Sequence, residues 1–332
     1  MIRTPIFQGS KSLYLFIFMS SSIVSVIIPT FNRKTLLRAL GSALQQSIGL
    51  KSVEVIVVND FSTDNTRELM EGLVSAFPQN IKLINNLKNS GPGNSRNAGI
   101  DAAKGDYLLF LDSDDFLTQN SLEKMVLCAK ENLSDIVLGK KNNLDGTTHA
   151  PGSTAKTVLK ASIYNAPLMH TIGPASKLFR SEFIRKNNIR FSENRKWGED
   201  QPFVIKSYFT ASNISILADD IYLYLDSDEL SLTRVVNNYL DRVVTTAEVC
   251  SIIKEYSNKN MDTSGVVAHV FCANLLPVIS SLVVEPDIDA RLFQSVKTLL
   301  ESYFTKNVIL RLTPQLRNAF EPLIEYIDSR SS

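Results

Sequence analysis

The chain of 332 residues is poor in cysteine, in net charge and in long hydrophobic segments, and each scarcity excludes a class of protein. Its three cysteines lie far apart, so they form neither a disulfide framework nor a zinc site, and they favour a reducing compartment. Lys and Arg total 35 against 34 Asp and Glu, a net charge of +1 that argues against a nucleic-acid partner. Hydrophobic residues still make up 44%, so the chain can bury a core, and its length fits about two domains.

The N-terminal segment leaves two interpretations open. No segment of the chain reaches the ~20 apolar residues that a membrane span needs, and the apolar run 13–19 near the N-terminus is far shorter. Lys11 precedes this run, but a signal peptide is disfavoured because no small-residue cleavage pattern follows it. Either the native chain starts at Met19, or residues 1–22 form an extension that attaches the protein peripherally to a membrane. We expect a cytoplasmic protein, held at the inner face of the plasma membrane on the second interpretation.

The first 140 residues alternate apolar runs with helical patterns. Nearly continuous apolar runs, typical of strands buried on both faces, occur at 23–28, 53–58, 81–84, 107–111 and 136–138. Helical patterns lie between them at 34–46, 66–77, 93–103 and 121–132. This alternation predicts an α/β fold with a mostly parallel, Rossmann-like sheet and right-handed crossovers.

Beyond residue 140 the pattern changes twice. Residues 141–160 are polar and are expected to form a loop, and the part that follows is mixed, with helices at 182–187 and 199–209 and strands at 214–217 and 221–225. From about residue 237 the pattern is helical, at 239–256, 266–284, 292–303 and 316–327, with Pro277 and Pro322 expected to kink or split two helices. We therefore predict four parts: the N-terminal segment 1–22, two halves at 23–140 and 141–235, and a small helical C-terminal module at 236–332.

Polar and acidic residues follow the predicted strands, at the edge where parallel α/β sheets bind ligands. The first two strands end in Pro29-Thr30-Phe31-Asn32 and Asn59-Asp60-Phe61. Ser62, Thr63 and Asp64 are explained as caps of the next helix. The fourth strand ends in Asp112-Ser113-Asp114-Asp115, whose carboxylates repel one another unless a cation is near. Mg²⁺ and Mn²⁺ prefer such hard oxygen ligands, so Asp112 and Asp114 are predicted to bind one of them.

Five stretches resemble glycosyltransferase family 2, which has the GT-A fold. They stand in the family's order, at 26–32, 59–64, 89–100, 111–115 and 198–200. The resemblance covers about residues 23–225, and it implies that 23–140 binds a nucleotide-sugar and 141–235 binds the acceptor. This sequence departs from the family at Asn59, where Asp is common, and at Phe61, where Gly is common.

The resemblance implies a UDP-sugar donor and a divalent metal, Mn²⁺ or Mg²⁺. Contacts to the nucleotide-sugar are implied for Pro29, Thr30, Asn32, Asp60, Asn89, Arg96, Asp112 and Ser113. Within this set, Asp60 and Asn89 would contact uracil or ribose, and the Arg96 guanidinium would lie at the nucleotide or its phosphates. Asp114, with Asp112, would hold the metal that bridges the diphosphate.

On the acceptor side the resemblance makes Asp200 the catalytic base and Glu199 a candidate contact to the acceptor or a phosphate. A purely structural reading makes both carboxylates favourable helix N-terminal residues. Trp197 either stacks on an acceptor sugar or packs. Lys177 either contacts an anionic acceptor or pairs with a local acid. Arg234 lies in a segment that resembles a loop closing over the diphosphate.

The function implied is an inverting, metal-dependent glycosyl transfer to a glycan, polyol-phosphate or lipid-linked acceptor. The spacing of the motifs and the short helical tail are similar to those of enzymes that glycosylate polyol-phosphate wall teichoic acid. One alternative is a nucleotidyltransferase, although no glycine-rich phosphate loop follows the first strand. The other is a non-catalytic protein that binds a sugar nucleotide, although the acidic motifs are intact.

The C-terminal helices also suggest a partner. Residues 266–284 are apolar on most of a helical surface, which must therefore be buried. Either they mediate a homo-oligomer, or they form a cap packed on the chain's own catalytic part. Both interpretations are open at this point.

Overall fold

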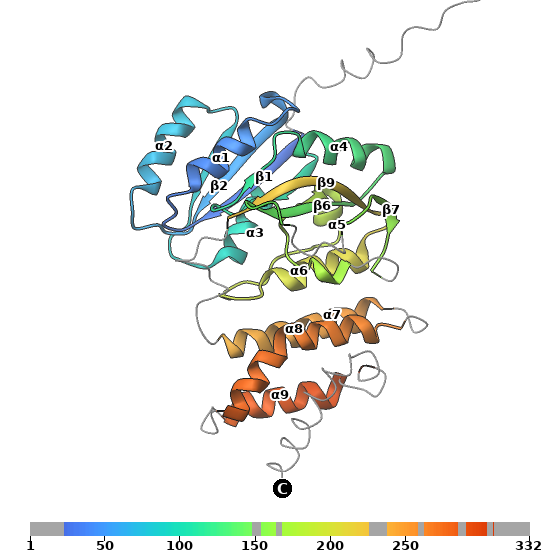
Figure 1. Cartoon of the computed structure of the whole chain (residues 1–332). Coiled ribbons are helices and arrows are strands. Elements are labelled where there is room, and N and C mark those ends of the chain that lie inside the picture. The colour runs from blue at the N-terminus through green and yellow to red at the C-terminus, as the bar shows by residue number, and fades with distance from the viewer. Residues whose placement is uncertain are drawn as a thin grey trace, which may run out of the picture.

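The computed structural model describes residues 23–147, 154–163, 168–225, 238–257, 262–284, 290–303 and 308. It shows an α/β unit with helices on both sides of a sheet, and a group of helices packed beneath it (Figure 1). The predicted segment 1–22, the helix 316–327 and Arg234 lie outside the described residues.

The N-terminal half of the sheet is parallel. β1 (Val24–Thr30), β2 (Val53–Asn59), β3 (Ile81–Asn85) and β4 (Tyr107–Phe110) lie in the order β3-β2-β1-β4. β1 is buried along its whole length because helices cover both faces of the sheet. The predicted α/β class and the four strands of this half are confirmed.

Alternate residues of β1 serve two different cores. Val26 and Ile28 pack with α1 (Leu36–Leu44), α2 (Thr66–Ala76) and α4 (Ser121–Asn132) on one face. Ile27 packs on the other face with α3 (Pro92–Ala102) and with α6 (Asp200–Thr210). This alternation, set by the period of two along a strand, fixes which helices reach the carboxyl edge from each side.

The second half of the sheet is mixed. β8 (Lys177–Arg180) inserts antiparallel between β4 and β6 (Ile136–Asn143), and β6 then pairs in parallel with β9 (Ile214–Tyr224). The short strands β5 (Phe116–Leu117) and β7 (Val158–Ala161) pair antiparallel with β9, and α5 (Ser181–Lys186) follows β8.

Two expectations for this half were wrong. The two strands predicted at 214–217 and 221–225 are one continuous strand, β9. Asp219 and Asp220 interrupt the apolar run, but they lie where the pairing of β9 with β6 shifts register, so the strand continues through them. The predicted loop 141–160 contains the end of β6 and the start of β7.

The C-terminal helices pack on the α/β unit. They are α7 (Tyr239–Tyr256), α8 (Ser264–Val284), which runs through Pro277 without being split, and α9 (Ala290–Tyr303). α7 contacts α6, and Val249 and Phe271 belong to the same buried cluster as Phe203 and Ile205 of α6. This arrangement matches the predicted cap, and its core is continuous with that of the sheet.

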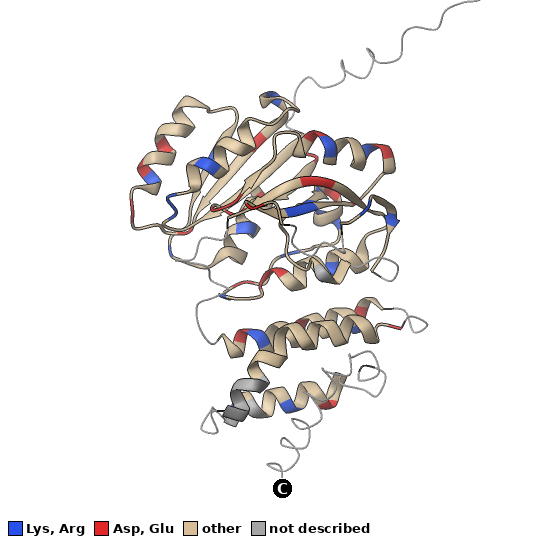
Figure 2. Cartoon of the chain, in the orientation of Figure 1, with Lys and Arg blue, Asp and Glu red and all other residues tan. Residues whose placement is uncertain are grey.

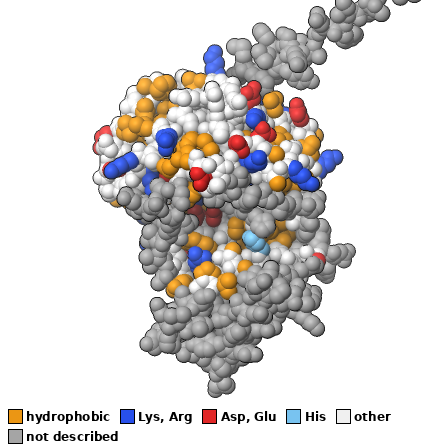
Figure 3. Space-filling view, in the orientation of Figure 1, with side chains coloured by type: hydrophobic (Ala, Val, Ile, Leu, Met, Phe, Trp, Pro, Cys, Tyr) orange, Lys and Arg blue, Asp and Glu red, His pale blue; other side chains and the backbone are white. Residues whose placement is uncertain are grey.

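The described surface is chemically mixed. Basic and acidic residues are interspersed along the ribbon (Figure 2), and on the face in Figure 3 the hydrophobic side chains of the α/β unit form small groups among charged and polar ones. Within the described part of the chain, no helix combines the length and the apolar character that crossing a bilayer demands.

Close packing of α3 on β1 yields a stability prediction. A Cβ atom on Gly99 would lie 2.3 Å from Cγ2 of Ile27. We expect Gly99→Ala to lower the free energy of unfolding by about 1–3 kcal/mol, as overpacking does. Gly41→Ala in α1 is the matched control, because a Cβ there meets nothing within 4 Å, and we expect it to stabilise the protein by about 0.5–1 kcal/mol. Urea denaturation measures both, and equal effects would contradict the packing argument.

Candidate functional site

The loops after β1, β2 and β3 are tied together by buried polar groups. Asp60 accepts hydrogen bonds from the Asn86 side chain at 2.7 Å and from the backbone nitrogens of Ser90 and Gly91 at 3.0 and 2.8 Å. Its carboxylate therefore fixes the loop that carries Asn89, whose own side chain is exposed. In this structure Asp60 fixes the loop after β3 at the carboxyl edge of the sheet.

Asn32 joins the loop after β1 to the loop after β2. Its backbone nitrogen donates to Ser62 Oγ at 3.0 Å, and its side-chain oxygen accepts from the backbone nitrogen of Thr63 at 2.8 Å. Pro29 and Thr30 lie in the buried strand just before it, opposite Val58 and Asn59. The three residues thus lie together at the end of β1, as the motif predicts.

Phe61 adopts a conformation that suits glycine. Its φ angle is +65°, and its side chain is 52% exposed. A left-handed conformation costs an L-residue roughly 1–2 kcal/mol. The family's usual glycine at this position is therefore explained by the backbone, and Phe61 keeps the same turn at that cost.

The acidic turn after β4 separates its three carboxylates. Asp112 and Asp114 are partly exposed, at 37% and 22% of their side chains, whereas Asp115 is buried and accepts a hydrogen bond from the Leu225 backbone nitrogen at 2.9 Å.

The backbone of this turn is held by two further hydrogen bonds. The Asp112 backbone nitrogen donates to the Tyr222 hydroxyl at 3.1 Å. Ser113 is buried, and its carbonyl accepts from Thr35 Oγ1 at 2.9 Å. Asp112 and Asp114 are the pair that faces outward.

Arg96 of α3 bridges the two acidic motifs. Its guanidinium donates to Asp112 Oδ1 at 2.9 Å and to Glu199 Oε1 at 2.7 Å, and it lies over the Phe191 ring at 5.3 Å. Burial opposes its charge, but the two carboxylates more than compensate and raise the pKa of Arg96. Arg96 is expected at the nucleotide, and in this structure its hydrogen bonds join the end of β4 to the start of α6.

Asp200 is the first residue of α6 and lies beside this bridge. Burial, and then the charge of Glu199, raise the pKa of its carboxyl to about 7. A Cβ on Gly173 would lie 3.4 Å from Asp200 Oδ2, so the small residue leaves room beside the carboxylate. A carboxyl group with a pKa near neutrality can both accept and release a proton when the surrounding solution is close to neutral.

Lys177 is buried, whereas Trp197 is partly exposed. Lys177 is 1% exposed, its Nζ donates to the Gly173 carbonyl at 2.6 Å, and burial lowers its pKa to about 7. The Trp197 ring is covered on one face by the Arg242 guanidinium at 4.1 Å. Packing thus accounts for at least one face of Trp197.

Sequence reasoning missed several residues at this edge. Arg33 lies 3.5 Å from Asp114 Oδ2, and Lys141 lies over the Tyr224 ring at 4.2 Å. Arg33 follows Asn32 directly at a strand end, which was a usable signal. Lys141 and Tyr222 come from β6 and β9, whose pairing was not predicted, so nothing in the sequence pointed to them.

A divalent cation fits the outward pair of carboxylates. Burial, and then the charge of Asp112, raise the pKa of Asp114, which is the electrostatic strain that a cation relieves. Among the residues that the structure describes, no group of three or more His, Cys, Asp or Glu is arranged to hold a metal. The two outward carboxylates are hard oxygen donors, the type of ligand that Mg²⁺ or Mn²⁺ would accept from a protein while keeping waters and phosphate oxygens as its other ligands.

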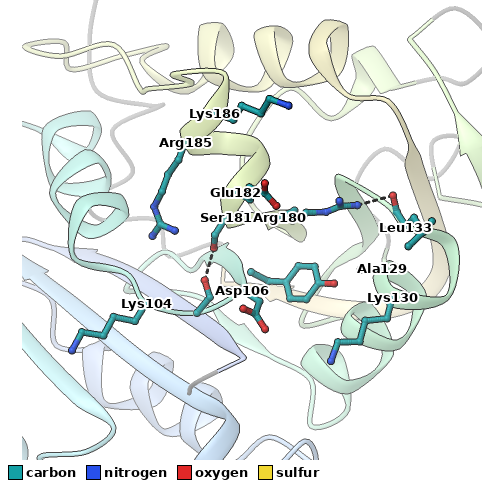
Figure 4. A pocket seen from close by; sticks show the side chains of 12 residues that line it. Lys104, Asp106, Ala129, Lys130, Leu133, Arg180, Ser181, Glu182, Arg185 and Lys186 are labelled. Carbon is teal, nitrogen blue, oxygen red and sulfur yellow. Dashed lines mark hydrogen bonds between the residues drawn. The ribbon is translucent and has the colours of Figure 1, made fainter. Parts of the chain in front are cut away.

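A groove of about 630 Å³ lies at the opposite edge of the sheet, beside Tyr107 at the start of β4 (Figure 4). Its charged lining is mainly basic: Lys104, Lys130, Arg180, Arg185 and Lys186, against Asp106 and Glu182. Arg180 donates to the Leu133 carbonyl at 2.7 Å and Arg185 to the Ala103 carbonyl at 2.6 Å, so both guanidinium groups already brace loops. None of the motif residues lines this groove.

Comparison with known proteins agrees with the arrangement of the motifs. Residues 25–187 match the family model described as Glycosyl transferase family 2. The poly(ribitol-phosphate) beta-glucosyltransferase of Bacillus spizizenii is 32% identical over 216 residues, which are 64% of this chain and 34% of that relative. The poly(ribitol-phosphate) beta-N-acetylglucosaminyltransferase TarP of Staphylococcus aureus is 33% identical over 219 residues, which are 64% of this chain and 66% of TarP. The chain therefore spans about a third of the first relative's length.

A solved structure resembles the chain over most of its length. The crystal structure of S. aureus TarS 1-349 in complex with UDP superposes with a TM-score of 0.78 at 25% identity, covering 92% of this chain and 87% of that one. The likeness therefore reaches beyond the residues of the family model and into the C-terminal helices.

The bridge formed by Arg96 yields a second stability prediction. Arg96→Gln should lower the free energy of unfolding by about 3–5 kcal/mol, because buried Glu199 would lose its cationic partner. Arg67→Gln, which breaks an exposed pair with Glu71 in α2, is the control and should change stability little. Chemical denaturation of both variants measures the difference. Similar losses in the two would show that the bridge contributes no more than a surface pair.

Proposed function

The chain belongs to glycosyl transferase family 2, and from this premise we propose that it transfers a sugar from a UDP-sugar to a hydroxyl group of a polyol-phosphate polymer of the wall teichoic acid type. The observation that carries the proposal is the meeting of Asp112, Arg96, Glu199 and Asp200 at one edge of the sheet. Two relatives are poly(ribitol-phosphate) transferases, which supports the acceptor class, and the similar TarS structure is a complex with UDP, which supports the donor.

The donor is proposed to lie over the ends of β1, β2 and β4. Asn32 and Asp60 hold the loops that border the nucleotide, and exposed Asn89 is placed to contact it directly. Asp112 and Asp114 would hold a Mg²⁺ or Mn²⁺ ion, which when bound neutralises charge on the diphosphate. Arg33, close to Asp114, adds a second positive group beside the same phosphates.

Transfer is proposed to proceed by a single displacement with inversion. The acceptor oxygen forms a bond to the anomeric carbon as the bond to the diphosphate breaks, and Asp200 accepts the hydroxyl proton. Glu199 and Arg96 keep the start of α6, and hence the Asp200 carboxylate, beside the end of β4. No covalent intermediate on the protein is required, because one carboxylate is enough for the proton transfer.

A panel of UDP-sugars with a polyol-phosphate acceptor tests this function. UDP release that depends on the acceptor supports a transferase, whereas pyrophosphate release from UTP and a sugar phosphate would support a nucleotidyltransferase. Binding of UDP-sugars without turnover would support a non-catalytic protein. Surface glycans and lipid-linked sugars belong in the same panel, since the acceptor class rests on the likeness to the poly(ribitol-phosphate) transferases.

Self-association through the residues after 235 and peripheral membrane attachment remain predictions. The described helices of the module pack on their own α/β unit, which supports the cap interpretation without testing a second copy. Light scattering on the full chain distinguishes a monomer from an oligomer.

The metal assignment predicts a loss of cation-dependent binding. Asp114→Ala should abolish the part of UDP affinity that Mn²⁺ contributes, because the variant keeps only one of the two outward carboxylates. Asp219→Ala, which removes the exposed partner of Lys124, should bind UDP as the unmodified protein does. Calorimetry with and without Mn²⁺ measures both. Unchanged affinity in folded Asp114→Ala would refute the assignment.

The base assignment predicts a defect in turnover with its own pH dependence. Asp200→Asn should keep UDP binding and lower kcat by about 10²–10⁴-fold, since the amide keeps the shape but accepts no proton. Because the pKa of Asp200 is raised to about 7, the base is protonated below that pH, and wild-type kcat should fall as pH drops through about 7. Asp101→Asn on the surface of α3 is the control. A variant Asp200→Asn with wild-type turnover would assign the base elsewhere.

A further inference from the structure

The segment that precedes Asp200 is a closed loop of residues 192–199, called here the base loop. Its ends meet where the Ser192 backbone nitrogen donates to the Glu199 carbonyl at 3.1 Å. Gly198 within it has a φ angle of +72°, which only glycine adopts freely. Asp200 begins α6 directly after this loop, so the position of the loop sets the position of the carboxylate.

The α3 side of the base loop is held by two asparagine side chains, and it approaches α3 closely where the helix has a glycine. The Asn97 amide bonds both the nitrogen and the oxygen of Phe191 at 3.0 Å, and Asn94 Oδ1 accepts from the Asn194 nitrogen at 2.9 Å. A Cβ on Gly93 would lie 2.3 Å from the Ser192 carbonyl oxygen. The contacts on this side of the base loop therefore come from α3, the helix that also carries Arg96.

The other side of the base loop is held by α7 of the C-terminal module. Glu248 accepts hydrogen bonds from Ser192 Oγ at 2.9 Å and pairs with Arg195 at 2.7 Å. Asp241 accepts from the Lys196 backbone nitrogen at 3.2 Å. A Cβ on Gly198 would lie 2.8 Å from Thr245 Oγ1, so the loop and the helix are in close contact.

Arg242 extends this contact to α8. Its guanidinium lies 4.1 Å from the centre of the Trp197 ring and donates to the Ala273 carbonyl at 3.4 Å. Beside it, the buried amides of Gln201 and Asn274 bond each other twice, at 2.8 and 3.1 Å. Gln201 is the neighbour of Asp200, so α8 reaches the residue next to the carboxylate.

We propose that α7 positions the catalytic base by clamping the base loop against α3, with Glu248 as the main positioning residue. Glu248 is suited to this because one carboxylate holds two separate loop residues, Ser192 and Arg195. The inference rests on the proposed role of Asp200 as base. It gives the C-terminal module a part in turnover that does not involve contact with donor or acceptor.

The test separates turnover from binding. Glu248→Gln keeps the size of the side chain and removes its charge, so the ion pair with Arg195 is lost. We expect kcat to fall between about tenfold and about 100-fold, as small misplacements of a catalytic group do, with the KM for UDP-sugar and the affinity for UDP within about twofold of wild type. Calorimetry with UDP and the melting temperature are recorded alongside turnover.

Arg195→Gln breaks the same pair from the loop side and should give the same phenotype. The double variant should be no slower than the slower single variant, because both remove one interaction. Glu255→Gln, on an exposed position of α7, is the matched control and should behave as wild type. If Glu248→Gln does not fold, Arg195→Gln carries the test alone.

Turnover within about twofold of wild type in both single variants would overturn the proposal. A parallel fall of kcat, UDP affinity and melting temperature would also overturn it, because it would indicate a general role in folding. Asp200→Asn measured in the same series separates the two hypotheses. If it is inactive while Glu248→Gln is normal, only the clamp fails; if it is active, the base assignment fails and the clamp with it.

Discussion

The arrangement of the site depends on one buried guanidinium. Arg96 holds Asp112 and Glu199 within hydrogen-bonding distance of itself, although these acids come from opposite halves of the chain and repel each other. The ion pair with Glu199 is almost wholly removed from water, where a missing partner is costly. The Arg96 guanidinium therefore fixes the distance between the end of β4 and the start of α6. It thereby also fixes the distance between the proposed metal ligands and the proposed base.

The other parts of the molecule secure this geometry from outside. Asp60 and Asn32 tie the loops of the parallel strands to one another, and Asp115 ties the acidic turn to the end of β9. The C-terminal helices support α6 from the other side, since their core is continuous with that of α6. The site is thus built from short polar links between elements that the hydrophobic core has already brought together.

The sequence predicts the parallel half of the sheet because its strands are long, apolar and separated by clear helices. It misses β8, which has only four residues, begins with Lys177 and pairs antiparallel where the pattern suggested a parallel neighbour. The motif at the end of the fourth strand marks Asp112, and the family resemblance marks Asp200 at the start of a helix. The bond from Arg96 to Glu199 spans 103 residues, and the contacts of Glu248 depend on how α7 packs, so no local pattern contains them.

The attachment of the base loop to α7 has a consequence for the order of events during synthesis. Chains are made from the N-terminus, and their parts begin to fold as they emerge. The strands and loops on the donor side are complete by residue 117, whereas Glu248 follows more than a hundred residues later. At translation rates of about 5–20 residues per second, the growing chain passes several seconds with its donor-side loops formed and its base loop held on one side only. The contacts of Glu248 become available only after α7 has been synthesised, so the base loop can be held on both sides only from that point on.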